Sequence, residues 1–432
     1  MKSSSGSGVK PPLRTAIAGI GGFAAAHHEE FARLELAGTA RVVAACDPAA
    51  DRLEEIQNTH RFAERGLEVH RSFDAMIHSV GGNLDLGVVA APIPLHAPMH
   101  EAFVRNGAAC YLEKPPTLDP EEFARMTGLE KGAAFATNVG FAYIHLPDRI
   151  ALKRRMISGE FGPLRRAAFL GLAQRRSAYY QRSNWAGKLM LGDSLVLDSC
   201  MGNALAHFLN NLLFFAGSAG VQDWARPTDM VCEMYRANPI EGTDTIFAQA
   251  GLTNGVELRI AASHACPNRD EVIEERLIFD HATVTIRGAT QVSIVRPDGP
   301  EESFPIAKAS LSGAIGHYCG YLMGDHPRPA QTLEDCRGFV ETNALFYLAG
   351  QRIQPVPAHS LGRDEDPSAV VIPDVADAAR GVMEHGTLPS QGGFAWANAG
   401  GSAGIAALPG LRRTVMRMAA ESPDAIRELS KI

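Results

Sequence analysis

The chain has 432 residues and a formal net charge of −7, with 46% hydrophobic and 21% charged residues. This composition is typical of a globular protein with a sizeable core and two to three domains. A mild net charge without a dense basic stripe argues against nucleic acid as a partner.

The sequence offers no membrane or secretion signal. No apolar run reaches the length of a membrane span, and the first twelve residues, MKSSSGSGVKPP, lack the apolar core of a signal peptide. Residues 1–12 are therefore expected to be a flexible tail. The seven cysteines are scattered, odd in number and never spaced as Cys-x-x-Cys. They indicate neither a disulfide framework nor a metal site, and reduced thiols favour a cytoplasmic protein.

Residues 13–139 alternate between short apolar runs and helical patterns. The expected strands are TAIAGIGG (15–22), RVVAACDP (41–48), LDLGVVAAP (84–92), AACYLEKP (108–115) and AAFATNVGF (133–141). The expected helices between and after them are AHHEEFARLEL (26–36), DRLEEIQNTHRFA (51–63), HAPMHEAFVRNG (96–107) and DPEEFARMTGLEKG (119–132). Repeated strand–helix–strand units predict a parallel sheet with helices on both faces.

Long strand patterns dominate after residue 140. A helix over 146–160 precedes expected strands at 164–174, 229–237, 244–265, 275–288 and 290–299, and a helix over 333–350 follows. The Asn254-Gly255 pair inside the third of these predicts a hairpin turn. The fold class is therefore α/β plus α+β: an N-terminal Rossmann-type parallel sheet and a C-terminal open, mainly antiparallel sheet over residues 140–350. We expect that sheet to build a homodimer or homotetramer face as well, and residues 351–432 form an extension without an assigned role.

The first strand meets its helix at a glycine-rich turn. The segment Gly19-Ile20-Gly21-Gly22-Phe23-Ala24 fits G-x-G-x-x-G/A, in which glycines let backbone amides approach a pyrophosphate at a helix N-terminus. Asp47 ends the second strand, where a carboxylate accepts both ribose hydroxyls and repels a 2′-phosphate. NAD is therefore favoured, with NADP as the alternative, and Asp47 can instead be a turn or capping residue before Pro48. The predicted cofactor-binding residues of this region are Gly19, Gly21, Gly22, Phe23, Ala24 and Asp47.

Lys114 follows an apolar run and precedes two prolines. Its predicted place is the carboxyl end of a parallel strand, where open α/β sheets bind ligands. Pro115 forces an extended conformation on Lys114 and stiffens the turn. A lysine held in this way is a site candidate, and the alternative is a surface lysine paired with Glu113.

These segments resemble the Gfo/Idh/MocA family, named for glucose-fructose oxidoreductase and inositol dehydrogenase. The likeness covers roughly residues 13–350, and the shared features are the glycine turn, APIPLH (91–96), LEKPPT (112–117) and the order of domains. It implies that Lys114 contacts the nicotinamide ribose and the substrate hydroxyl, and that Pro92 and His96 line the nicotinamide pocket. The predicted cofactor-binding set therefore also includes Pro92, His96, Glu113 and Lys114.

The resemblance also points to the segment DSCMGNALAHFLNN, residues 198–211. The family carries an aspartate, a histidine four residues later and an aspartate three further on, and this chain has Asn203, His207 and Asn210. Oxidation of an alcohol needs a base, and histidine has the pKa closest to neutrality. His207 is therefore the predicted base. An amide orients a hydroxyl but does not relay its proton, so Asn203 and Asn210 are predicted to bind substrate, and Asp198 is left as the local carboxylate.

The segment YYQRSNWAGK, residues 179–188, mixes aromatic and cationic side chains. Aromatic faces stack on sugar C–H groups, so Arg182, Asn184, Trp185 and Lys188 are predicted to bind substrate. The alternative is an aromatic packing corner with solvated charges. His27, His28 and His100 are expected at helix surfaces or turns, and no cluster has metal-ligand spacing.

The sequence thus predicts an oxidoreductase that transfers hydride between NAD and a hydroxyl-bearing carbon of a sugar, polyol or inositol-like substrate, with Lys114 and His207 as catalytic residues. One alternative keeps the fold: a NAD-dependent glycosidase that oxidises a glycoside transiently, eliminates the aglycone and returns the hydride. Another is a NAD-binding sensor without catalysis.

Overall fold

A computed structural model describes residues 11–430, so the expected tail over residues 1–12 lies outside the described residues except for its last two. Contacts divide the chain into two units, and neither unit is continuous in sequence. The first unit holds the chain up to Pro116 together with residues 125–145 and 309–333. The second holds residues 117–124, 146–308 and 334–432, so the C-terminal extension belongs to it.

The first unit is built on a six-stranded sheet in the order β3-β2-β1-β4-β5-β6. Its strands are β1 (Leu13–Ala18), β2 (Ala40–Cys46), β3 (Glu68–His70), β4 (Leu86–Val89), β5 (Ala109–Leu112) and β6 (Asn138–Val139). Every pairing in it is parallel. This order and direction define the Rossmann sheet that the sequence pattern predicts.

Helices cover both faces of this sheet. They are α1 (Ala24–Leu36), α2 (Glu54–Thr59), α3 (Phe62–Arg65), α4 (Phe73–Val80), α5 (His96–Arg105) and α10 (Leu311–Met323), while α6 (Pro120–Glu130) is divided between the units. Ile315 and Tyr318 of α10 join Phe31 of α1 in one buried cluster on the sheet. On strand β4 a Cβ at Gly87 would lie 2.3 Å from the Phe103 ring of α5, so this glycine allows the close packing of α5.

The second unit is built on a ten-stranded sheet in the order β16-β15-β14-β13-β7-β12-β11-β10-β17, with β20 also paired to β10. Its strands are β7 (Leu164–Leu172), β10 (Pro227–Arg236), β11 (Thr245–Leu252), β12 (Glu257–Ser263), β13 (Val272–Phe279), β14 (Thr283–Arg287), β15 (Gln291–Val295), β16 (Glu302–Pro305), β17 (Gln354–Pro355) and β20 (Gly401–Gly404). The β7–β12 and β10–β17 pairs are parallel and the others antiparallel. The predicted mainly antiparallel sheet is confirmed. Two small hairpins pair β8 (Met190–Leu191) with β9 (Ser194–Leu195) and β18 (Gly362–Arg363) with β19 (Val370–Val371).

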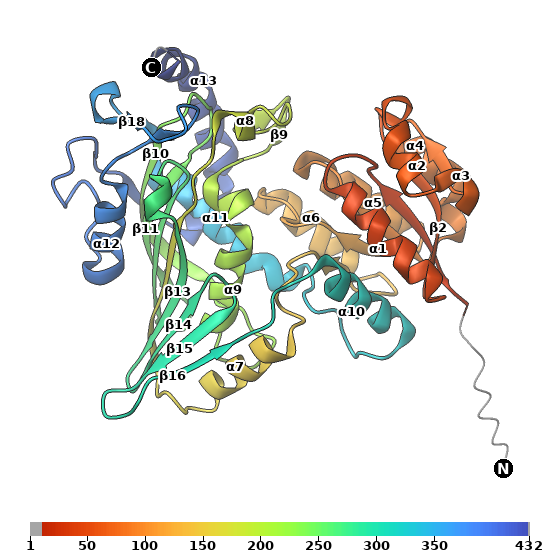
Figure 1. The fold of residues 1–432 in the computed structure, drawn as a ribbon, viewed down its shortest axis with the longest axis horizontal. Coiled ribbons are helices and arrows are strands. Elements are labelled where there is room, and N and C mark those ends of the chain that lie inside the picture. Colours follow the sequence, from red (N-terminus) through yellow and green to blue (C-terminus); the bar gives the residue numbers. More distant parts are fainter. Residues whose placement is uncertain (1–10, 431–432) are drawn as a thin grey trace. The chain divides into compact units, whose positions relative to one another are not determined.

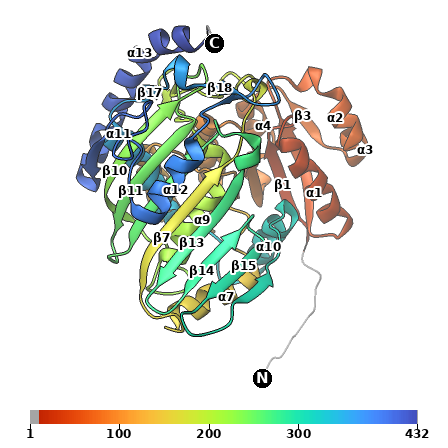
Figure 2. The same ribbon diagram turned by 60° about the vertical axis from the view of Figure 1, so that its left-hand side comes forward.

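Helices lie on both faces of the ten-stranded sheet (Figure 1). They are α7 (Pro147–Ile157), α8 (Ser177–Tyr180), α9 (Ala206–Ala216), α11 (Arg337–Gly350), α12 (Val375–His385) and α13 (Leu411–Leu429). Successive residues of β7 point to opposite faces, so Phe169 stacks on Phe208 of α9 at 5.6 Å while Ala168 and Leu172 pack toward α12. Figure 2 shows α12 lying across the strands. Residues beyond 350 therefore complete the core of the second unit.

Several elements differ from the sequence-based expectations. The helix expected over 51–63 is broken into a 3-10 turn, α2 and α3, because Arg61 adopts a left-handed φ of 55° between the two helices. The strand expected over 133–141 pairs only over Asn138–Val139. The structure also contains β3, α4, α10, α12 and α13, for which the sequence pattern gives no prediction. The Asn254-Gly255 hairpin is confirmed, with φ of 81° at Gly255.

Candidate active site

Three segments singled out by the sequence leave neighbouring strands of the first unit. The glycine turn follows β1, the 91–96 segment follows β4, and the Glu113-Lys114-Pro115 segment follows β5. Strands β1, β4 and β5 are adjacent and parallel, so all three segments reach the same edge of the sheet. This carboxyl edge is where Rossmann-type sheets bind ligands.

The glycine turn has no room for a side chain at its first position. Gly19 has φ of 122°, and a Cβ there would lie 2.5 Å from the Ala90 oxygen and 2.8 Å from the Ala24 Cβ. Ala24 is the first residue of α1, so a small side chain is also required there. Gly19 and Ala24 thus allow the tight turn and close packing at the start of α1 that are typical of a phosphate-binding turn.

Asp47 connects the end of β2 to this turn. Its Oδ2 accepts hydrogen bonds from the backbone amides of Ile20 and Gly21 at 3.2 and 3.3 Å, and its Oδ1 accepts one from Ala49 at 2.9 Å. The residue therefore forms the local turn and also places a carboxylate beside the glycine loop. Both features fit a dinucleotide, whose adenosine ribose would be bound by a carboxylate at this position.

Lys114 is half-buried, and a cis peptide bond joins it to Pro115. The buried His96 holds this segment in place, because its Nδ1 lies 2.8 Å from the Pro115 oxygen and its Nε2 lies 2.8 Å from the Ala91 oxygen. Burial lowers the pKa of His96, an effect opposed by these carbonyl groups. Pro92 is exposed beside it. The ring of His96 ties the segments after β4 and β5 together, which is a positioning contact that the sequence did not indicate.

Glu113 is buried, and its carboxylate lies between two groups. Its Oε1 is 3.0 Å from Nε2 of His27, and its Oε2 accepts a hydrogen bond from the Lys114 amide at 3.1 Å. His27 is fully buried on α1. The carboxylate of Glu113 is therefore buried, and it is paired with His27 as well as bonded to the Lys114 amide.

The expectation of surface positions for His27, His28 and His100 is wrong. All three are buried: His28 Nε2 lies 3.0 Å from the Gly19 oxygen, and His100 Nε2 lies 2.9 Å from Thr137 Oγ1. Burial lowers the pKa values of His28 and His100 to about 4. Their hydrogen-bond partners lie in other segments of the chain, so no local sequence pattern predicts that these histidines are buried.

In the second unit, Asp198 organises the segment that leads into α9. Its Oδ2 accepts a hydrogen bond from the Gly187 amide at 2.6 Å, and its Oδ1 accepts one from Asn203 Nδ2 at 3.0 Å. Arg182 lies 3.6 Å from the same carboxylate. Asn203 is therefore oriented by a buried carboxylate. The sequence indicates Asp198 as the local acid but does not predict this contact.

The residue before Asp198 has an unusual backbone. Leu197 is fully buried with φ of 50°, a left-handed conformation that is a genuine outlier for a bulky side chain. Its carbonyl accepts a hydrogen bond from the Tyr347 hydroxyl at 3.2 Å. Such strained positions concentrate at functional sites, and this one directly precedes Asp198, which bonds to Gly187 and Asn203.

Asn203 and His207 do not lie on one regular α-helix. Residues Cys200–Ala204 make a π-helical turn, in which the Leu205 amide donates to the Cys200 oxygen at 2.9 Å, and α9 begins only at Ala206. His207 is half-buried in the first turn of α9, and Asn210 is fully buried one turn further on. π-helical turns of this kind are frequent at functional sites.

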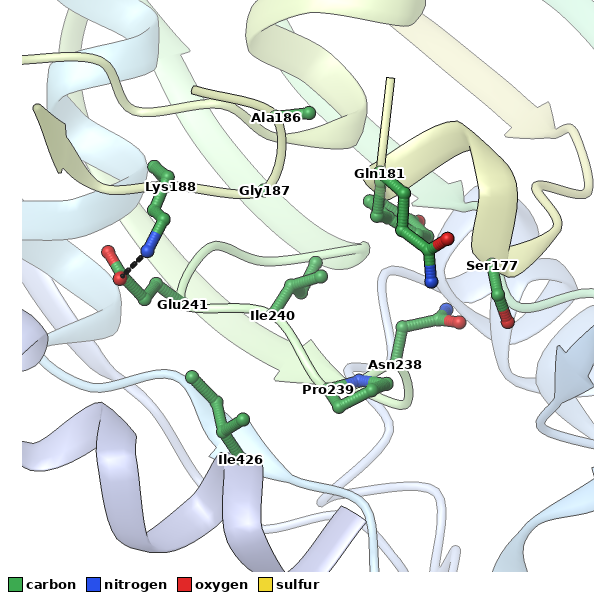
Figure 3. Close-up of a pocket in the computed structure, with 11 residues that line it drawn as sticks. Ser177, Gln181, Ala186, Gly187, Lys188, Asn238, Pro239, Ile240, Glu241 and Ile426 are labelled. Carbon is green, nitrogen blue, oxygen red and sulfur yellow. Dashed lines mark hydrogen bonds and ion pairs between the residues drawn. The ribbon is translucent and has the colours of Figure 1, made fainter. Parts of the chain in front are cut away.

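The aromatic segment 179–188 packs around Arg182. Its guanidinium carbon lies 3.8 Å from the centre of the Tyr179 ring and 4.9 Å from that of Trp185, so much of its face is covered by aromatic rings. Lys188 Nζ lies 2.7 Å from Glu241 Oε1 (Figure 3), and Asn184 is exposed. Arg182 and Trp185 thus pack in an aromatic cluster, and their binding of substrate stays a prediction.

Residues 11–430 contain neither a cluster of potential metal ligands nor a helix able to span a membrane. No group of three or more histidine, cysteine or acidic side chains within this range could hold a metal ion. None of the helices described is long and apolar enough to cross a membrane.

Comparison with known proteins supports the sequence-based resemblance. Residues 13–141 match the model of the Gfo/Idh/MocA family, described as an oxidoreductase family with an NAD-binding Rossmann fold. This match confirms the predicted resemblance and the predicted NAD-type cofactor for residues 13–141. No curated protein sequence matches the chain.

Solved structures share the fold over most of the chain. The WlbA dehydrogenase from Bordetella pertussis, in complex with NADH and UDP-GlcNAcA, has 18% identity and a TM-score of 0.63, covering 78% of this chain and 96% of its own. UDP-N-acetylglucosamine 3-dehydrogenase GnnA from Acidithiobacillus ferrooxidans has 19% identity and a TM-score of 0.60, with 79% and 98% covered. An oxidoreductase from Agrobacterium radiobacter, in complex with NAD+, L-tartaric acid and magnesium, has 16% identity and a TM-score of 0.61, with 78% and 96% covered. At these identities the likeness establishes a shared fold.

Proposed function

We propose that this protein is an NAD-dependent oxidoreductase acting on a hydroxyl-bearing carbon of a sugar, polyol or inositol-like substrate. The observation that carries the proposal is the position of Lys114 at the same sheet edge as the glycine turn. The family-model match over residues 13–141 and the sugar-nucleotide dehydrogenases among the similar structures support the proposal. When bound, the nicotinamide supplies the hydride acceptor.

The chain's own residues then have separate roles. Lys114 holds and polarises the reacting oxygen, since its ammonium is a compact point charge on a segment fixed by His96. His207 takes or returns the hydroxyl proton, because imidazole titrates near neutral pH. Asn203, held by Asp198 through its amide nitrogen, presents its carbonyl oxygen to a neighbouring hydroxyl.

Substitution of Lys114 tests this assignment. The variant Lys114→Ala is expected to lower turnover about 100- to 10,000-fold, the range typical of a lost acid–base or polarising group, while NAD affinity changes far less. The control is Lys131→Ala, which removes an exposed lysine from the same unit. Turnover is followed as nicotinamide reduction with NAD and with NADP over a panel of sugars and inositols. Unchanged turnover in Lys114→Ala would exclude the proposed role.

The same assay separates the alternatives. Asn203 and Asn210 stand where the resemblance implies two carboxylates of a proton relay. Because of this difference, a redox-neutral glycosidase is the second candidate. That enzyme would release the aglycone of an aryl glycoside without accumulating reduced cofactor. Tight NAD binding without reaction on any substrate would instead indicate a sensor.

We propose a homo-oligomer that does not use the central strands of the ten-stranded sheet. On one face of this sheet, helix α12 and Trp396 cover the apolar residues of β7, β11 and β12. A second copy would have to dock elsewhere on the sheet. The mass of the native protein, measured by light scattering, tests the assembly.

We also propose a cytoplasmic location. All seven cysteines are buried and none forms a disulfide. Buried, unpaired thiols suit a reducing compartment. Fractionation of cells that produce the protein tests this assignment.

A further inference from the structure

A pocket of about 300 Å³ opens in the second unit (Figure 3). Helix α8, the segment after it, the loop between β10 and β11, and helix α13 form its walls. Its lining residues are Ser177, Tyr180, Gln181, Ala186, Gly187, Lys188, Asn238, Pro239, Ile240, Glu241 and Ile426. Only Lys188 of this set was predicted to bind substrate.

Neutral polar groups dominate one side of the pocket. Figure 3 shows Ser177, Gln181 and Asn238 turning their polar ends toward one another. Asn238 is fully buried: its Nδ2 donates to Asp244 at 2.9 Å, whereas its Oδ1 has no hydrogen-bond partner among the described residues. The buried hydroxyl of Tyr180 also lacks one there. An unsatisfied buried polar atom costs about 1–3 kcal/mol. Both of these atoms are covered by protein, so the polar groups that a ligand can reach on this side are those of Ser177 and Gln181.

The opposite side offers an ion pair and apolar surface. Lys188 is the one cation among the described lining residues, and its Nζ lies 2.7 Å from Glu241 Oε1. The pair presents donors and acceptors together with no net charge. Ile240 and Ile426 supply apolar contacts. This combination suits a ring with hydroxyl groups and C–H faces better than a phosphate, because the Lys188 cation is already paired with a carboxylate.

The pocket wall is bonded directly to the Asp198 segment. Gly187 donates from its amide to Asp198 Oδ2 at 2.6 Å, and the Asp198 amide donates to the Lys188 oxygen at 2.9 Å. Gly242, beside Glu241, donates to the Gly187 oxygen at 2.8 Å. A ligand in the pocket therefore contacts the loop segments that position Asp198 and, through it, Asn203.

We propose that this pocket binds a neutral sugar ring, namely the part of a glycoside that is not itself oxidised. The inference rests on the proposed function and narrows its substrate class to a neutral disaccharide or glycoside. The volume lies at the small end of the range for small-molecule sites, about 300–1,000 Å³, which suits one ring better than a nucleoside diphosphate.

Binding measurements on the full chain with NADH test the pocket without turnover, because the reduced cofactor cannot accept hydride from an alcohol. The probes are maltose and cellobiose as neutral disaccharides and UMP as an anionic nucleotide, titrated by calorimetry. The variant Ile426→Trp fills the pocket from α13. Its matched control is Met416→Trp, at a position on the same helix that is 54% exposed and outside the pocket.

We expect at least one disaccharide to bind with a millimolar Kd, and Ile426→Trp to weaken it at least tenfold while Met416→Trp leaves it unchanged. Gln181→Ala, at an exposed position, is a second variant that should weaken binding without affecting the fold. No saturable binding of either disaccharide, equal binding in Ile426→Trp, or UMP binding that Ile426→Trp abolishes would overturn the proposal. Disaccharide binding that depends on Ile426, without nicotinamide reduction by any sugar, would retain the pocket and reject the oxidoreductase function.

Discussion

His27 and Glu113 form a buried pair in which Nε2 of the histidine lies 3.0 Å from Oε1 of the carboxylate. The two residues are 86 positions apart in sequence, and the pair connects the first helix after the glycine turn to the segment that presents Lys114. The Glu-Lys-Pro motif therefore includes a partner on α1 that the motif itself does not contain.

Removal of this partner should destabilise the first unit. The variant His27→Phe keeps an aromatic ring but leaves the buried Oε1 of Glu113 without its donor, which costs about 1–3 kcal/mol of unfolding free energy. The variant His27→Gln retains a donor and should lose less. Urea unfolding at pH 7 measures both, and equal stability of His27→Phe and wild type would show that the pair contributes nothing.

Gly19 should be intolerant of any side chain. In Gly19→Ala the added Cβ would collide with the Ala90 oxygen, 2.5 Å away, and displace the turn that cradles the cofactor. We expect NAD affinity to fall by about tenfold or more, equal to at least 1.4 kcal/mol. Gly38→Ala is the control, since Gly38 also has positive φ, at 70°, but its Cβ would meet no atom within 4 Å. Calorimetric titration with NAD compares the two, and an equal effect would point to backbone strain alone.

The pair formed by Asp198 and Asn203 should resist a second carboxylate. In Asn203→Asp, the new carboxylate at a half-buried position would stand about 3.0 Å from the buried Asp198, so we expect lower stability at pH 7 and partial recovery at pH 5, where one group protonates. The swapped variant Asp198→Asn with Asn203→Asp restores one carboxylate and one amide. Thermal unfolding of the single and double variants measures this coupling, which is absent if their effects simply add.

Acid should destabilise the fold through buried neutral histidines. Burial lowers the pKa of His100 from 6.5 to about 4, so between these values the unfolded chain binds a proton that the folded chain does not. Stability therefore falls as pH decreases through this window, by about 2 kcal/mol between pH 7 and pH 5 for this group. His100→Gln retains a donor for Thr137 and should reduce the acid sensitivity by that amount. Urea unfolding at both pH values measures the difference, and an unchanged pH dependence would contradict the assignment.

Trp396 should be essential to the second unit. It is buried against Tyr235, with ring centres 5.0 Å apart, and its Nε1 donates to Asp374 at 2.8 Å. Trp396→Ala is expected to lower the unfolding free energy by about 3–5 kcal/mol, and Trp396→Phe by less, because Phe retains most of the buried ring. Denaturant unfolding decides this point. Stability close to wild type in Trp396→Ala would mean that residues beyond 350 contribute little to this core.

The sequence alone determined the features that rest on local patterns. Alternation of short apolar runs with helices predicts the parallel sheet, because parallel strands buried on both faces need continuous apolar segments and crossover helices. The glycine turn and the Glu-Lys-Pro motif could be found in the same way, since turns and proline-stiffened segments depend on adjacent residues. The Asn254-Gly255 hairpin also depends on adjacent residues, and the structure confirms it.

Only the tertiary structure decided which distant groups meet. The burial of His27 against Glu113, the contacts of His96 with two carbonyl groups and the pairing of Asn203 with Asp198 depend on chain segments that fold together. The packing of α12 on the sheet also depends on distant segments. The sequence of an amphipathic helix shows that one face is apolar, but it does not show which surface that face covers. The polar pocket beside Asp198 is also formed by three separate segments, namely residues 177–188, residues 238–241 and helix α13 with Ile426. Local propensity fixes secondary structure, whereas burial and hydrogen-bond satisfaction across the chain fix the site.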